Sequence, residues 1–380
     1  MKTTNPFTQN DRRFMGAALG LARRGLGNVA PNPAVGCVLV RPDLDGGITG
    51  GGRIVGRGWT QPGGRPHAET EALRRAGALA NGATAYVTLE PCCHTGKTGP
   101  CTEALIAAGV TRVVVAVVDP FAKVAGQGIK DLRAAGLTVD TGLFEAKAAE
   151  VNAGFFKSVS ENRPLVTLKV ASSLDGRIAV ANGDSKWLTG PQARERGHLM
   201  RAQADAILVG GGTVTADDPD LTCRLPGMTG RSPVRVVMAS GLSAQSKLYK
   251  AAGDPPVWLM SGPKSDSQPP AKEGFSTFKV EGDANGRPDP AAVLAKLAEQ
   301  GITRLLIEGG GTVAASFLKA GLIDRIAWFH APVIVGGDGL PAIAGLSTAR
   351  MADALRLERL SVEVIGEDVL EMLAVHPRPA

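Results

Sequence analysis

Apolar and polar residues follow two different spacings in residues 1–160. Short runs rich in Val, Leu and Ala are bounded by glycine, proline or polar residues, and between them lie segments whose apolar residues recur every three or four positions. The first spacing is typical of buried strands and the second of helices that cover a sheet, so a layered α/β domain is predicted. Strands are expected at 35–40, 52–59, 83–89, 112–118 and near Leu137, and helices at 10–24, 67–76, 102–108 and 128–135. The glycine-rich residues 45–52 are expected to form a hairpin loop.

The same alternation starts again after a polar stretch at 158–164, which predicts a junction between two domains, 1–160 and 161–380. A chain of 380 residues is long enough for two or three domains. Expected strands are 165–171, 206–209, 234–238, 257–260, 304–307 and 325–329, followed by an antiparallel pair at 362–365 and 369–375. Expected helices are 191–202, 289–300 and 312–320, and 262–274 is expected to be a loop.

Composition supports a folded, water-soluble chain. Hydrophobic residues make up 44% and charged residues 21%, which excludes a disordered chain, a collagen-like fibre and a coiled coil. No run of about 18 apolar residues is present, so no membrane span is predicted. Arg12-Arg13 and the apolar residues after them loosely resemble an export signal, but that run ends at Arg23-Arg24 and its apolar residues share one helical face. A cytoplasmic protein is therefore expected.

Positive charge is concentrated in the first domain. The net charge is +6, and residues 1–160 hold 18 Lys and Arg against 12 Asp and Glu, whereas the remainder is balanced. A basic surface raises the question of nucleic acid, but aromatic residues are only 4% of the chain and provide few rings on which bases could stack. We therefore expect no nucleic acid as a partner.

Candidate metal ligands lie close together in the first domain. His67-Ala-Glu69 begins a predicted helix, and Pro91-Cys92 and Pro100-Cys101 follow. Zinc favours imidazole and thiolate donors, and a catalytic site uses three of them and leaves the fourth position to water. Glu69 can take a proton from that water and pass it to a leaving amine, as in the zinc deaminases.

Spacing alone leaves alternatives at this site. Cys92 and Cys101 are nine residues apart, so Cys93 or His94 could replace Cys92 as a ligand. A fourth protein ligand would make the zinc site purely structural. The carboxylate of Glu69 argues against that, because a structural site has no use for it.

Four segments of this half resemble, in order, the deaminase half of the bifunctional riboflavin-biosynthesis deaminase/reductase family. They are Pro31-Asn-Pro-Ala-Val-Gly36, His67-Ala-Glu69, the stretch from Glu90-Pro-Cys-Cys to Pro100-Cys101, and Asp119-Pro120 with Val124-Ala-Gly-Gln-Gly128. Cys93 stands where the family usually has Ser, and Gly99 where it often has Pro.

The resemblance implies a cytidine-deaminase-like three-layer α/β/α domain that binds zinc and removes an amine from a diaminopyrimidinone carrying a ribosylamino phosphate. His67, Cys92 and Cys101 would bind zinc, with Glu69 as the proton shuttle. Arg65 and Lys97 either meet the substrate phosphate or lie on a solvated surface.

Two glycine clusters mark strand-to-helix junctions in the second domain. They are Gly210-Gly-Gly212-Thr213 and Glu308-Gly-Gly-Gly-Thr312. Glycine lets a backbone approach a ligand, and amides at a helix start attract phosphate. Neither cluster has the spacing of a Rossmann fingerprint or the lysine of a P-loop, and each alone is typical of an ordinary tight turn.

With their neighbours, these clusters resemble the reductase half of the same family. The matching stretches begin at Lys169, Ser185, Arg201, Thr213 and Glu308. The resemblance implies a dihydrofolate-reductase-like α/β domain that reduces the ribosyl group to ribityl with NADPH. Residues implied to line the NADPH site are Ala171, Trp187, Thr213, Asp217, Ser240, Gly310, Gly311, Thr312 and Ser316. Residues implied to hold the substrate are Ser185, Arg201, Leu221, Arg224 and Glu308.

Several residues keep a second interpretation. The family often has Asp-Ser where this chain has Ala239-Ser240, which weakens the assignment of Ser240, and Asp217 could instead cap a turn. Cys37 is expected to be a packed core thiol. Structural or surface roles are expected for Cys223, His198, His330 and His376.

The combined prediction is a bifunctional enzyme that binds Zn²⁺ and NADPH. The resemblance also implies a homo-oligomer, a dimer or larger, built through the reductase half. The alternative is a base deaminase that acts on nucleic acid such as tRNA and carries an accessory domain, although such an enzyme has no use for 220 further residues with nucleotide-binding loops.

Overall fold

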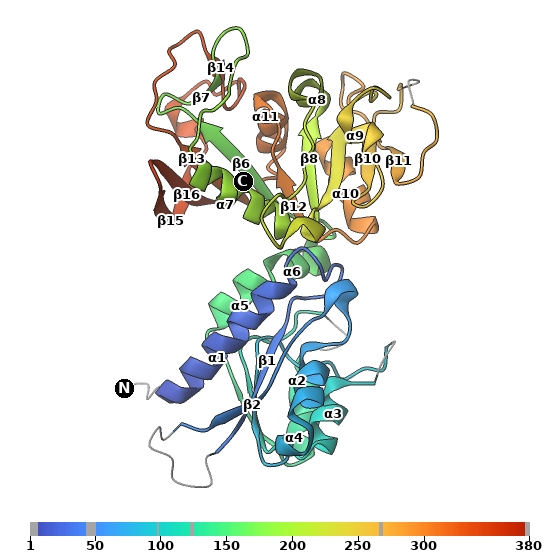
Figure 1. Ribbon diagram of the computed structural model, residues 1–380, viewed down its shortest axis with the longest axis vertical. Coiled ribbons are helices and arrows are strands. Elements are labelled where there is room, and N and C mark those ends of the chain that lie inside the picture. The colour runs from blue at the N-terminus through green and yellow to red at the C-terminus, as the bar shows by residue number, and fades with distance from the viewer. Residues whose placement is uncertain (1–6, 43–50, 97–98, 122–124, 266–268, 377–380) are drawn as a thin grey trace. The chain divides into compact units, whose positions relative to one another are not determined.

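The computed structural model describes residues 7–42, 51–96, 99–121, 125–265 and 269–376. The chain forms two compact units, Met1–Glu161 and Asn162–Ala380 (Figure 1). The division falls within the polar stretch 158–164 where a junction was expected, and α6 (Ala153–Glu161) continues to the end of the first unit. Most of the expected hairpin loop at 45–52 lies outside the described residues.

Unit 1 contains a five-stranded mixed sheet in the order β2-β1-β3-β4-β5. β1 pairs antiparallel with both β2 and β3, whereas β3, β4 and β5 are parallel to one another. The strands are β1 (Gly36–Arg41), β2 (Arg53–Trp59), β3 (Thr84–Val87), β4 (Arg112–Val115) and β5 (Thr138–Thr141). All five agree with the sequence prediction to within a few residues.

Helices cover both faces of this sheet. A Cβ at Gly36 would lie 1.9 Å from the Ala18 carbonyl oxygen of α1, and a Cβ at Gly58 would lie 2.0 Å from that of Ala68 in α2. Gly36 pairs with Trp59, so Gly36 and Gly58 face opposite sides and place α1 and α2 on opposite faces. The helices are α1 (Gln9–Ala22) and α5 (Glu145–Val151) on one face, and α2 (Ala68–Ala76), α3 (Cys101–Ala107) and α4 (Gln127–Ala134) on the other.

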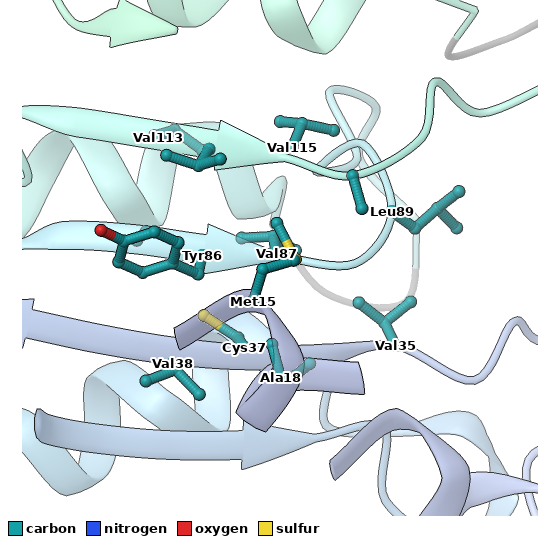
Figure 2. Close-up of a cluster of buried hydrophobic side chains, with 14 of the residues drawn as sticks. Met15, Ala18, Val35, Cys37, Val38, Tyr86, Val87, Leu89, Val113 and Val115 are labelled. Atoms are coloured by element: carbon teal, nitrogen blue, oxygen red, sulfur yellow. The ribbon is translucent and has the colours of Figure 1, made fainter. Parts of the chain in front are cut away.

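The core of unit 1 lies between these layers. Figure 2 shows Met15 of α1 beside Cys37 of β1 and Val87 of β3, and all three side chains are fully buried. Cys37 is thus the packed core thiol that was expected. Burial of each large apolar side chain contributes roughly 1.5–3 kcal/mol to folding. The three layers confirm the predicted fold class of the first domain.

Unit 2 contains a nine-stranded sheet in the order β11-β10-β9-β8-β12-β6-β13-β16-β15. Neighbouring strands are parallel from β11 to β13, and β13, β16 and β15 are antiparallel, as predicted for the C-terminal pair. The strands are β6 (Leu165–Ser172), β8 (Ala206–Gly210), β9 (Val234–Met238), β10 (Val257–Ser261), β11 (Phe275–Lys279), β12 (Arg304–Ile307), β13 (Arg325–His330), β15 (Leu357–Ile365) and β16 (Asp368–Val375). A separate pair joins β7 (Arg177–Ala179) to β14 (Leu340–Pro341).

The helices of unit 2 include one that the sequence pattern did not predict, the single turn α9. α8 begins at the first glycine cluster, where a strand-to-helix junction was predicted. The helices are α7 (Pro191–Ala202), α8 (Gly211–Asp217), α9 (Lys247–Lys250), α10 (Pro290–Glu299) and α11 (Gly311–Lys319). In the described part of the chain, no helix combines the length and apolar character needed to cross a membrane.

Candidate functional site

Three of the predicted metal ligands meet at one edge of the unit 1 sheet. His67 directly precedes α2, Cys101 is the first residue of α3, and Cys92 lies in the loop after β3. His67 Nδ1 lies 3.3 Å from Cys101 Sγ and 3.5 Å from Cys92 Sγ. Within the described ranges, this is the one group of three or more His, Cys, Asp or Glu residues whose ligand atoms lie close enough to share a metal ion.

The backbone also brings the two cysteines together. The Cys101 amide donates to Cys92 Sγ across 3.4 Å, and the Thr102 amide donates to the Cys92 carbonyl oxygen across 3.2 Å. A hydrogen bond from the Cys101 thiol, together with the effect of His67, lowers the pKa of Cys92 to about 4 against the opposing effect of burial. One imidazole and two sulfurs, all within 4.8 Å of one another, fit the donor preference of zinc. Cys93 is not part of this group.

Glu69 lies in the first turn of α2, two residues beyond His67. Its side chain is only 3% exposed, and it lines the cavity that opens on the ligand group. Burial, followed by the charge of Cys92, raises the pKa of Glu69 to about 7, although His67 opposes this. A carboxyl group with such a pKa can both accept and donate a proton near neutral pH.

The cavity beside the ligand group has a volume of about 260 Å³. Its walls are formed by Asn32, Pro33, Val35, Thr60, Arg65, His67, Glu69, Leu89, Glu90, Cys92, His94, Asp119, Phe121, Phe155 and Val159. Arg65 is the one Lys or Arg among these residues, and Lys97 lies outside the described residues.

Glu90 has a role that the sequence did not reveal. Its carboxylate accepts hydrogen bonds from the backbone amides of Gly126 (2.9 Å), Asp119 (3.2 Å) and Ile129 (3.2 Å). These bonds fix the segment after β4, whose Asp119 and Phe121 form one wall of the cavity. Burial raises the pKa of Asp119 to about 6. The sequence feature that could have indicated this role is the position of Glu90 two residues before Cys92.

The two glycine clusters of unit 2 lie side by side. β8 leads into α8 and β12 leads into α11, and the Gly310 amide donates to Thr213 Oγ1 across 3.2 Å. Gly310 caps α11 and has no side chain, so the cap residue itself makes no hydrogen bond to the first amides of this helix. Such amides can bind the phosphate groups of a dinucleotide, so the chain's own backbone fits NADPH here.

A second cavity of about 270 Å³ lies in unit 2. It brings together six residues predicted from the resemblance: Ala171, Ser185, Trp187, Arg201, Arg224 and Glu308. The other residues that line it are Lys169, Ile178, Leu188, Thr189, Ala193, Arg194, Gly197, His198 and Phe329. His198 was expected to be structural or on the surface, but it lines this cavity and its Nδ1 accepts the Arg224 amide across 3.3 Å.

Arg201 and Glu308 form a bidentate ion pair in this cavity, with distances of 2.8 and 2.9 Å. Lys169 Nζ lies 3.8 Å from the same carboxylate. Burial alone would raise the pKa of Glu308, but the charges of Arg201 and Lys169 outweigh it and lower that pKa to about 2. The sequence placed Lys169 at the start of a matching stretch but gave it no role. Its ion pair with Glu308 is evident only from the fold.

The remaining predicted residues lie outside the lining of the second cavity. Thr312 and Ser316 belong to α11, which begins at Gly311, and the Ser316 hydroxyl donates to the Val313 carbonyl. Asp217 is the exposed last residue of α8, and Ser240 is exposed beyond β9. Leu221 is buried with a φ of 57°. The structure therefore does not gather every predicted reductase residue around one cavity.

Comparisons with known proteins match both units. The cytidine and deoxycytidylate deaminase zinc-binding region matches residues 8–117, and the RibD C-terminal domain matches residues 164–370. The riboflavin biosynthesis protein RibD of Escherichia coli (strain K12) is 40% identical over 374 residues, covering 94% of this chain and 98% of the relative. The chain belongs to the RibD family. RibD of Aquifex aeolicus (strain VF5) is 39% identical over 362 residues, covering 95% of this chain and 97% of the relative.

Solved RibD structures agree with this assignment. Acinetobacter baumannii RibD, form 1, has a TM-score of 0.83 and 38% identity, covering 97% of this chain and 99% of that chain. A Thermotoga maritima diaminohydroxyphosphoribosylaminopyrimidine deaminase/5-amino-6-(5-phosphoribosylamino)uracil reductase has a TM-score of 0.83 and 34% identity, with coverage of 97% and 99%.

Membership of the RibD family confirms the predicted function class. The chain is a bifunctional riboflavin-biosynthesis enzyme that joins a zinc-dependent deaminase to an NADPH-dependent reductase. The alternative, a nucleic-acid base deaminase with an accessory domain, is not supported, because the second half matches the RibD reductase domain.

Proposed function

We propose that residues 1–160 deaminate 2,5-diamino-6-(5-phosphoribosylamino)pyrimidin-4(3H)-one and that residues 161–380 reduce the ribosyl group of the product to ribityl with NADPH. The observation that carries the proposal is the gathering of three metal-ligand atoms within 4.8 Å beside the buried Glu69. The name of the Thermotoga maritima relative specifies the same two reactions.

In the deaminase half, His67, Cys92 and Cys101 would hold Zn²⁺. Bound zinc supplies an activated water at neutral pH. Glu69 would accept a proton from that water and deliver it to the departing amine, which leaves as ammonia. Its pKa of about 7 suits both transfers. Arg65, the one Lys or Arg among the described residues that line the cavity, would contact the substrate phosphate.

In the reductase half, NADPH supplies the hydride. The residues proposed to line the NADPH site are Ala171, Trp187, Thr213, Asp217, Ser240, Gly310, Gly311, Thr312 and Ser316. The residues proposed to hold the substrate are Ser185, Arg201, Leu221, Arg224 and Glu308. Arg224 is better placed than Arg201 to bind the phosphate. The side chain of Arg224 is 56% exposed, and its ion pair with Asp220 is long, at 3.8 Å. Arg201 instead pairs closely with Glu308, at 2.8 Å. Orientation of the ribosyl group and exclusion of water are the protein's main contributions to such a reaction.

Assembly into a homo-oligomer through the reductase half is also part of the proposal. β15 forms one edge of the nine-stranded sheet and exposes Leu360, Val362 and Val364, the last of which is 74% exposed. A long, apolar edge strand is unfavourable in water unless another chain covers it. Sedimentation of the full chain tests this, and a monomer that persists at micromolar concentration would contradict it.

A two-step assay tests the two reactions. The full chain is incubated with the diaminopyrimidinone phosphate, with and without NADPH, and the products are followed by mass spectrometry. Deamination should occur in both samples, and a gain of two hydrogens should occur only with NADPH. In Glu69→Gln, ammonia release should be lost while NADPH oxidation on deaminated substrate persists. Loss of both activities together would contradict separate sites.

A further inference from the structure

Three arginines and one tryptophan line the same hollow on unit 1, outside the deaminase cavity. Arg24 follows α1, Arg57 and Trp59 belong to β2, and Arg75 belongs to α2. The guanidinium carbons of Arg24 and Arg75 lie 5.1 and 5.0 Å from the centre of the Trp59 ring. Both distances are within the range of cation–π attraction. We refer to these four residues as the arginine–tryptophan cluster.

The cluster lines a hollow of about 560 Å³ at the free edge of the unit 1 sheet. Ala17, Gly20 and Leu21 of α1 form the rest of its wall. The hollow therefore combines guanidinium groups with an apolar surface made largely of small residues. Its volume is in the range of small-molecule sites, about 300–1,000 Å³.

The positive charge of the cluster is only partly balanced. Arg75 pairs with Glu71 across 2.6 Å, but Arg74 shares the same carboxylate across 2.9 Å. Among the described residues, Arg57 has no hydrogen bond or ion pair, and its side chain is exposed. A guanidinium in this position can bind a phosphate group through two parallel hydrogen bonds.

The hollow does not belong to the deaminase site. It shares no lining residue with the cavity beside His67. Among the described residues that line that cavity, Arg65 is the only Lys or Arg. The deamination reaction therefore leaves these three arginines without a role. Their alternative role is to shield the indole ring from water through their own aliphatic stems.

We propose that the arginine–tryptophan cluster is a binding site for a small ligand that carries both a phosphate group and a planar ring, as a mononucleotide does. Arg57 binds the phosphate, and the ring lies on the apolar wall formed by α1 beside Trp59. The site is separate from both reactions and does not depend on their assignment.

Trp59 provides a direct reporter, because the other tryptophans of the chain, at 187, 258 and 328, all belong to unit 2. The full chain is titrated with AMP, adenosine or inorganic phosphate while tryptophan fluorescence is recorded. The same titration of Trp59→Phe gives the contribution of unit 2, including any AMP at the NADPH site. The difference between the two proteins reports on the cluster alone.

AMP should give a saturable signal that depends on Trp59, and AMP should bind about tenfold more tightly than phosphate or adenosine, because each probe lacks one of the two contacts. Arg57→Gln should weaken AMP binding about tenfold through loss of a charge-assisted hydrogen bond. Arg53→Gln is the matched control, since Arg53 is exposed on the same strand but does not line the hollow. Deamination rates should be unchanged in both variants.

Two results would overturn the proposal. One is the absence of any Trp59-dependent signal up to about 10 mM AMP, beyond the weakest affinity expected of such a site, which would assign the arginines to shielding of the indole. The other is a signal that Arg57→Gln leaves unchanged, which would show that the guanidinium does not bind the phosphate. Equal binding of AMP and phosphate would contradict the planar-ring part of the proposal.

Discussion

The Gly310 amide donates a hydrogen bond to Thr213 Oγ1, and this bond joins two glycine clusters that lie 97 residues apart in the chain. Each cluster alone has the sequence of an ordinary turn. Because β8 and β12 are neighbouring parallel strands, their carboxyl ends bring the two turns to the same edge of the sheet. The proposed NADPH site therefore depends on a contact that neither segment shows by itself.

Loss of this hydrogen bond should weaken NADPH binding selectively. Thr213→Val keeps the shape of the side chain but removes the acceptor, at a cost of about 1 kcal/mol, so KM for NADPH should rise about fivefold. Steady-state reductase kinetics measure this change. Thr215→Val is the control, because the Thr215 hydroxyl bonds to Gly211 within the same helix. Equal effects of the two substitutions would contradict a specific role for Thr213.

One pair of substitutions can distinguish the predicted zinc ligand Cys92 from its neighbour Cys93. Cys92→Ser should lower the zinc content of the purified protein from one per chain to nearly none, because a hydroxyl is a poor ligand for zinc. Cys93→Ser should retain one zinc, since Cys93 lies outside the ligand group. Metal analysis by mass spectrometry measures both. Zinc loss in Cys93→Ser and retention in Cys92→Ser would exchange the two assignments.

The bidentate pair between Arg201 and Glu308 should control the reductase but not the deaminase. Arg201→Lys keeps the charge but cannot form both hydrogen bonds to the carboxylate, so kcat/KM for reduction should fall about tenfold or more. Ammonia release in the same protein should be unchanged. An equal loss of both activities would instead indicate that the substitution unfolds the chain.

Acid should destabilise unit 1 through Asp11. Burial would raise the pKa of this carboxyl, but hydrogen bonds from Arg112, Thr8 and Tyr86 lower it from 3.8 to about 2. A carboxyl with a depressed pKa contributes stability above its unfolded pKa and loses that contribution as the pH falls, here from about 3.8 to about 2. The difference corresponds to about 2 kcal/mol.

Urea unfolding between pH 6 and pH 2.5 measures this contribution, at intervals of about half a pH unit. The free energy of unfolding of Asp11→Asn should be lower than that of the parent chain at pH 6, and the difference should shrink as the pH falls toward 2.5. Asp140→Asn serves as the control, because Asp140 is more exposed and pairs with the same Arg112. A constant difference between Asp11→Asn and the parent chain at every pH would contradict the assignment.

The sequence predicts the zinc ligands better than it predicts the walls of the cavity. His67, Cys92 and Cys101 belong to a local motif whose residue types and order already imply their chemistry. Phe155 reaches the same cavity from a segment with no such signature. Glu90 belongs to the motif that contains Cys92, but its role in holding the cavity wall follows only from tertiary contacts. Sequence reasoning cannot rank such contacts, because many pairings of these segments satisfy the same hydrophobic pattern.

The same limit applies to the fold. Buried strands such as β4 are evident from their continuous apolar runs, whereas α6 was not predicted because its sequence is polar at the end. In this helix, packing against the rest of the unit outweighs local preference. Leu221 illustrates a further case, since its left-handed φ of 57° is set by its surroundings and not by its own preference.

The close approach at Gly58 has a mechanical consequence for the metal centre. Ala68, whose carbonyl oxygen lies where a side chain at position 58 would be, stands between His67 and Glu69. Because Gly58 of β2 has no side chain, the start of α2 can pack this close to the sheet. Cys92 and Cys101 are held by other elements, so even a methyl group at position 58 would move one metal ligand and the proton carrier away from the other two ligands. The missing Cβ of Gly58 on an edge strand thus keeps His67 and Glu69 in position relative to Cys92 and Cys101.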